Sequence, residues 1–172
     1  MSFEVYKRLC EELYNGKGDD HLFAHSILKM EWNLMARSDN YADMHLQHIQ
    51  WRSDILIYYV GTSKVNQTRD RANDPWNVYS NPKNPKICPV IALAKYFFSR
   101  LNILTTNSKL FPGNHQYERF LKILYRIINN NLEEFQSLGF DKRTLGSYSV
   151  RKRSITIVAS GCTVSPPTAS IF

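Results

Sequence analysis

The sequence predicts a single, mainly helical α+β domain with a small three-stranded antiparallel sheet. Apolar residues recur at three- and four-residue spacing before residue 37 and again after Pro89, which is the period of amphipathic helices. Between these regions lie an alternating segment, 44–49, an apolar run, 55–60, and a short segment, 76–79, all typical of strands. The length of 172 residues suits one domain with a core of its own.

Two helices are predicted at the start of the chain. The first covers residues 3–14 and is ended by Gly16 and Gly18. The second begins at Asp19 or Asp20, either of which can cap it, and continues to Arg37. Its buried stripe is expected to comprise Leu22, Phe23, Ile27, Leu28, Met30, Leu34 and Met35.

The predicted strands follow in order along the chain. A polar turn at 52–54 joins the strands at 44–49 and 55–60, and a polar loop at 66–75 leads to the third strand. Two Asn-Pro pairs, Asn81-Pro82 and Asn84-Pro85, then end the sheet. The result is a small antiparallel sheet between two helical regions.

The second half of the chain is predicted to be helical. Pro89 occupies a first-turn position of a helix that includes Leu101, and another helix covers 117–130. A loop around Gly139 and Gly146 is expected to cover the last core residues before the C-terminal region, Phe135, Leu138 and Phe140.

A final helix is expected to begin at Ser147 or Ser149 and to end at Gly161. The segment 165–172 has a serine and prolines suited to the start of one more helix. Because the sequence ends there, we expect the chain to be truncated.

The charge of the chain predicts a polyanionic partner. The formal net charge is +7 and the pI is about 9.4. No Asp or Glu follows Asp141, so the basic surface is expected to be local; a solvated charged face is the alternative. The five cations of this region are Lys142, Arg143, Arg151, Lys152 and Arg153.

The sequence indicates neither a disulfide framework nor a membrane span. Cys10, Cys88 and Cys162 are odd in number and scattered, which favours a reducing, intracellular setting, nuclear if the source is eukaryotic. The chain lacks a signal-like start, and its longest apolar stretch, Ile55–Val60, is too short to cross a bilayer.

No metal or cofactor site is predicted. His45 and His48 are expected to point to opposite faces of a strand, and the other histidines, His21, His25 and His115, lack carboxylates at useful spacing. The three tryptophans, Trp32, Trp51 and Trp76, are expected in the core rather than as platforms for bases.

Two distant arginines suggest a phosphate site. If the fold brings Arg37 and Arg151 together with Lys64 between them, they form a pocket for one phosphodiester, because guanidinium groups match phosphate oxygens bidentately. The alternatives are that Arg37 stabilises a helix end or pairs with Asp39, and that Lys64 is a solvated turn residue.

The order of these motifs and elements resembles the catalytic domain of tyrosine recombinases, in particular the crypton-type branch. The resemblance covers about residues 20 to 172. It rests on Glu31-Trp32-Asn33-Leu34-Met35-Ala36-Arg37-Ser38-Asp39-Asn40, on Tyr79-Ser80-Asn81-Pro82, on Ile87-Cys88-Pro89-Val90-Ile91-Ala92-Leu93 and on Ser149-Val150-Arg151-Lys152.

The resemblance implies a role for each matching residue. Arg37 and Arg151 would hold the scissile phosphate, and Lys64, between the second and third strands, would protonate the leaving oxygen without a metal. The family's usual histidine falls on Tyr148, a poor proton shuttle. No tyrosine follows Tyr148, so the attacking nucleophile is missing, as is the DNA-clamping domain that precedes the family's catalytic domain.

The expected function is therefore double-stranded DNA binding by an integrase-like domain of mobile-element origin, from a family that carries out DNA recombination and integration. The chain is expected to be inactive by itself, and a homo-oligomer on DNA is one expected arrangement. The first alternative is an active recombinase whose tyrosine comes from another subunit or from beyond Phe172. The second is a protein-interaction module whose basic face is incidental.

Overall fold

The computed structural model describes residues 1–34, 44–52, 55–59, 75–100 and 108–141. Its first helices are α1 (Phe3–Asn15) and α2 (Asp19–Leu34). A 3-10 helix, η1 (Leu46–His48), precedes the strands β1 (Ile49–Arg52), β2 (Ile55–Tyr59) and β3 (Pro75–Tyr79). A second 3-10 helix, η2 (Pro85–Ile87), is followed by the helices α4 (Pro89–Phe98), α5 (Gln116–Asn130) and α6 (Leu132–Ser137). The predicted fold class, a mainly helical α+β domain with a three-stranded antiparallel sheet, is confirmed.

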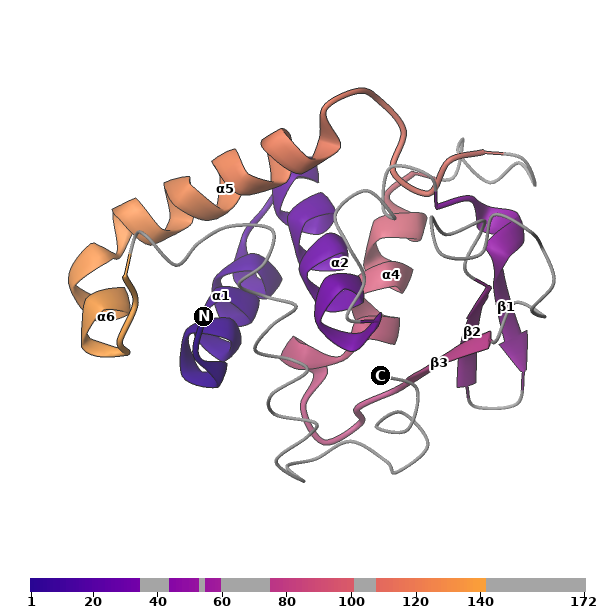
Figure 1. Ribbon diagram of the computed structural model, residues 1–172, viewed down its shortest axis with the longest axis horizontal. Coiled ribbons are helices and arrows are strands. Elements are labelled where there is room, and N and C mark those ends of the chain that lie inside the picture. Colours follow the sequence, from indigo (N-terminus) through magenta and orange to yellow (C-terminus); the bar gives the residue numbers. More distant parts are fainter. Residues whose placement is uncertain (35–43, 53–54, 60–74, 101–107, 142–172) are drawn as a thin grey trace, which may run out of the picture.

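The helices and the sheet occupy different parts of the molecule (Figure 1). α1, α2 and α4 lie side by side in the middle, with α2 in contact with both of the others. α5 and α6 lie at one end, and the sheet lies at the other, where β3 contacts α4 and α2. The core is continuous from α1 to the sheet.

α1 begins and ends as the sequence predicts. The Ser2 hydroxyl caps its first turn by accepting a hydrogen bond from the backbone N–H of Val5 at 3.2 Å. The same hydroxyl donates to the carbonyl of Leu138 at 3.3 Å, which ties the start of α1 to the end of α6. At the other end the N–H of Gly16 closes the last turn on Glu12.

α2 is buried on every side rather than along one stripe. All nine residues from Phe23 to Met30 and on to Glu31 are buried, over more than two turns. A helix packed against α1, α4, α5 and β3 has no face left for solvent. The members of the predicted stripe from Phe23 to Leu34 are therefore part of a wider buried surface, which also includes the polar residues His25, Ser26, Lys29 and Glu31. Leu22 is half-buried, and Met35 lies outside the described residues.

The sheet has the predicted antiparallel order β1-β2-β3, but its first strand begins later than predicted. Residues 44–46 instead pair with 108–110: the N–H of Leu110 donates to the carbonyl of Met44 at 2.7 Å. The chain then makes the 3-10 turn η1 and enters β1 at Ile49. The prediction of a single strand at 44–49 was therefore wrong, because residues 44–46 pair with a segment distant in sequence and only Ile49 belongs to β1.

α6 is a short helix that the sequence analysis did not predict. It contains Phe135, which is buried as expected, whereas the part of the predicted loop around Gly146 lies outside the described residues. The N–H of Gly139 donates to Gln136 and that of Phe140 to Phe135, both at 2.9 Å, which is the Schellman pattern at a helix end. Gly139 has the required positive φ of 80°, and the Phe135 and Phe140 rings meet edge to face as the motif favours.

Candidate nucleic-acid interface

The residues that the sequence assigns to the DNA site all lie outside the described residues. Their roles therefore stay predictions. They are Arg37, Lys64, Tyr148, Arg151, Lys142, Arg143, Lys152 and Arg153. The final helix predicted at 147–161 lies outside the described residues as well.

Described elements precede two of these residues closely in the sequence. α2 ends at Leu34, shortly before Arg37, and β2 ends at Tyr59, shortly before Lys64. Tyr59 and Pro75 are register partners, so the segment that contains Lys64 connects two neighbouring antiparallel strands. The order of helix, arginine, two strands, lysine and third strand agrees with the order expected from the sequence.

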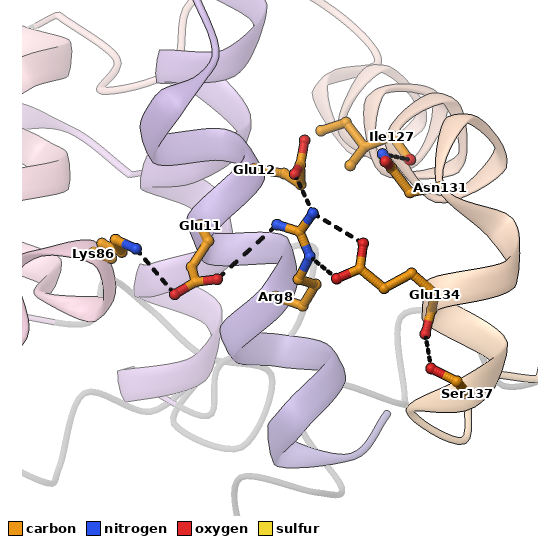
Figure 2. A network of polar contacts seen from close by, with 8 residues as sticks. All are labelled: Arg8, Glu11, Glu12, Lys86, Ile127, Asn131, Glu134 and Ser137. Atoms are coloured by element: carbon orange, nitrogen blue, oxygen red, sulfur yellow. Dashed lines mark hydrogen bonds and ion pairs between the residues drawn. The ribbon is translucent and has the colours of Figure 1, made fainter.

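Many described cations are held in ion pairs between helices. Figure 2 shows one such network, in which the Arg8 guanidinium on α1 binds the Glu134 carboxylate on α6 with two hydrogen bonds, at 2.6 and 3.0 Å. Arg8 also pairs with Glu12 at 2.6 Å, and Glu11 pairs with Lys86 at 3.1 Å. The hydrogen bond from Arg8 lowers the pKa of Glu134.

A second set of ion pairs joins α2 to α5 and to Arg100, just after the end of α4. Asp20 accepts from Arg119 at 2.7 Å and from Arg126 at 3.2 Å, and Asp19 pairs with Arg100 at 3.3 Å. The hydrogen bond from Arg119 is the largest cause of the lowered pKa of Asp20. These ion pairs connect separate parts of the helical region, and the single Asp20 carboxylate is shared by Arg119 and Arg126.

A smaller group of cations has no such partner. In the described part of the chain these lysines and arginines are exposed and form no ion pair, which leaves their charge available to an anion. They are Lys17, Arg52, Lys83 and Lys122. Arg52 was predicted in a turn and lies instead in β1, so the structure places an unbalanced cation on the sheet.

α2 carries a buried lysine that the sequence analysis missed. Lys29 is fully buried, and its ammonium has no nitrogen or oxygen acceptor in the described structure. It lies over the Tyr6 ring, 5.0 Å from the centroid, and interacts with the Cys10 thiol. Burial lowers the pKa of Lys29, and the thiol offsets this only in part.

Two further ionisable groups of α2 are buried. The Nε2–H of His25 donates to the carbonyl of Lys86 at 3.1 Å, and burial lowers the pKa of this imidazole to about 3. Glu31 has no hydrogen-bond partner for either carboxylate oxygen in the described residues, and burial raises its pKa to about 8. The apolar neighbours Ile27, Leu28 and Met30 were the signal that could have identified this all-round burial.

Two predictions about aromatic and histidine residues were wrong. His45 and His48 lie at a 3-10 turn rather than on opposite faces of a strand, and their rings meet edge to face with centroids 5.4 Å apart. Trp51 is 57% exposed, although its register partner Leu56 belongs to the core. Trp32 does pack on the core, stacked on Tyr6. No cluster of three or more metal-ligating side chains occurs among the described residues.

Neither of the comparisons with known proteins assigns the chain to a family. No protein-family model matches it, and no curated protein matches its sequence. Within the described ranges, no helix has both the length and the apolar character needed to cross a membrane.

Proposed function

We propose that this chain is a duplex-DNA-binding domain of the tyrosine recombinase class, derived from a mobile element. Arg37, Lys64 and Arg151 hold one phosphodiester, and Tyr148 donates a hydrogen bond to it. The neighbouring cations contact the flanking backbone and carry no sequence information of their own. They are Lys142, Arg143, Lys152 and Arg153.

One observation carries the proposal: the order in which the basic motifs and the secondary-structure elements alternate. Arg37 follows the central helix, Lys64 falls between β2 and β3, and Arg151 lies in a basic segment after the last described helix. This order supports the resemblance to the recombinase catalytic domain. In a eukaryote such a protein would act in the nucleus.

The distribution of charge supports the same conclusion. The segments outside the described residues hold nine of the 22 lysines and arginines but only five of the 15 acids. In the described part, Arg8, Arg100, Arg119 and Arg126 are already paired with carboxylates. We therefore expect most cations available to a polyanion to come from the segments that contain Arg37, Lys64 and Arg151.

The activity proposed for these 172 residues is binding. Attack on the phosphodiester needs a nucleophile, and no tyrosine follows Tyr148 in this sequence. Cleavage would require a tyrosine from another subunit or from residues beyond Phe172.

The test is a duplex-DNA titration across salt concentrations. Replacing Arg37 and Arg151 together by Ala should flatten the slope of log K against log salt by about 1.8, since each phosphate contact contributes about 0.9. The matched control replaces Lys17 and Lys122 by Ala, which removes the same charge from exposed, unpaired positions. An equal flattening in the control, or no change in the arginine variant, would exclude the pocket and leave the protein-interaction module as the better reading.

A further inference from the structure

The sheet has one face on the core and one face directed away from it. Leu56 and Val78 are register partners, and both belong to the core. Because successive residues of a strand point to opposite faces, Ile55, Ile57 and Tyr79 lie on the other face. We call this second face the outer face of the sheet.

The outer face presents two rows of side chains across the three strands. Its exposed members are a cation, a phenol ring and two amides, which lie around the buried Ile57; Tyr79 is 41% exposed and Ile57 only 7%. The register sets the rows as Arg52–Ile55–Tyr79 and Gln50–Ile57–Asn77. Two strand spacings, about 10 Å, separate the backbone of Arg52 from that of Tyr79.

The charge of this face favours an anion. Neither row contains a carboxylate, and Arg52 forms no ion pair with any described residue. Other arginines of the described structure, such as Arg8 and Arg119, are paired with acids. Two copies meeting through this face would bring together two unpaired arginines on chains of net charge +7, which opposes self-association.

The remaining side chains favour an anion that carries unpaired bases. A base whose face is free can stack on Tyr79, and the amides of Gln50 and Asn77 can meet its polar edge. In a duplex the base faces are already stacked on one another, so the Tyr79 ring has nothing to stack on. We propose that the outer face of the sheet binds single-stranded nucleic acid, with Arg52 on a phosphate and Tyr79 on a base.

This surface shares no residue with the predicted duplex site, and the inference does not rest on that site. The test measures binding of labelled oligothymidylate and oligouridylate, each about 16 nucleotides long, by fluorescence anisotropy at several salt concentrations. Comparison of the two oligonucleotides tells whether the ligand is DNA or RNA. Tyr79→Ala should weaken affinity roughly 5- to 150-fold, and Tyr79→Phe should retain it because the ring still stacks.

Arg52→Ala should flatten the single-strand salt slope by about 0.7, and Arg52→Lys should preserve the slope. The controls are Phe98→Ala, which removes a 77% exposed ring at the end of α4, and Lys122→Ala on α5, away from the sheet (Figure 1). Equal losses in these controls would overturn the inference. Absence of single-strand binding by the native chain would also overturn it, as would a dimer that dissociates in the Tyr79→Ala variant.

The duplex titration separates this inference from the proposed function. If the variant lacking Arg37 and Arg151 loses duplex binding but keeps single-strand binding, and Tyr79→Ala and Arg52→Ala weaken single-strand binding, both proposals hold. If its duplex binding is unchanged while Tyr79→Ala and Arg52→Ala weaken single-strand binding, only the outer face of the sheet is supported.

Discussion

Replacing Glu31 by Gln should stabilise the protein at neutral pH and have little effect in acid. Glu31 is 1% exposed, and neither carboxylate oxygen has a hydrogen-bond partner in the described residues. Burial raises its pKa from 4.5 to about 8, so the folded protein keeps a proton that the unfolded chain releases. The Gln side chain has nearly the same shape and cannot ionise.

The size of the effect follows from proton linkage. Between pH 4.5 and about 8 the folded state binds one more proton than the unfolded state, so stability falls by about 1.4 kcal/mol for each pH unit of increase. At pH 7 the accumulated loss is about 3 kcal/mol, and below pH 4.5 it disappears. Glu31→Gln removes this loss, which corresponds to a rise in Tm of roughly 6 to 12 °C at pH 7 for a chain of this size.

The assay is urea unfolding of the native and variant proteins at pH 4 and pH 7, followed by circular dichroism. Glu133→Gln is the matched control, because it removes an exposed carboxylate from α6. The reasoning is refuted if Glu31→Gln changes the free energy of unfolding equally at the two pH values. A variant that is less stable than the native protein at pH 7 would refute it as well.

Three further predictions concern buried groups and a helix end. The pKa of His25 is lowered to about 3, so the unfolded chain binds a proton that the folded protein does not, and the stability of the native protein rises with pH from about 3 to 6.5. When the pH is lowered from 7 to 4, the free energy of unfolding should therefore fall by about 3 kcal/mol less in a His25→Gln variant than in the native protein, as urea unfolding would show. Lys29→Met should stabilise the protein by about 1–3 kcal/mol at pH 7, because it removes a buried cation without an acceptor. The lowered pKa of Lys29 implies that this gain shrinks as pH rises, so a gain equal at neutral and alkaline pH would contradict the assignment. Gly139→Ala should cost about 1–2 kcal/mol through its positive φ, with Gly139→Asn milder; equal thermal stability of Gly139→Ala and the native protein would argue against the Schellman end.

The elements with strong local signals were predicted well. α1, α4 and α5 begin and end within a few residues of their predicted bounds where these are described, because spacing, caps and prolines are local properties. The failures have tertiary causes. Met44 pairs with a segment more than sixty residues away, and Trp51 is exposed although its register partner Leu56 lies in the core. The residues next to Met44 and Trp51 in the sequence indicate neither this pairing nor this exposure.

The candidate binding residues also fall into a group chosen from the sequence and a group that only the structure brings together. Arg37, Lys64 and Arg151 were chosen from motif order alone, and their joint pocket stays a prediction because they lie outside the described residues. The outer face of the sheet was not predicted, since Arg52 was assigned to a turn. Only the register of β1, β2 and β3 brings Arg52 and Tyr79 into one row.

The sequence by itself determined the fold class, the number and type of most elements, and the excess of positive charge, because hydrophobic period, capping and composition are readable one segment at a time. The tertiary structure alone decided which groups lose their water. Lys29 and Glu31 look like ordinary surface charges on an amphipathic helix until α1, α4, α5 and β3 close around α2. Burial is a property of all the neighbours of a side chain, and most of those neighbours are distant in sequence.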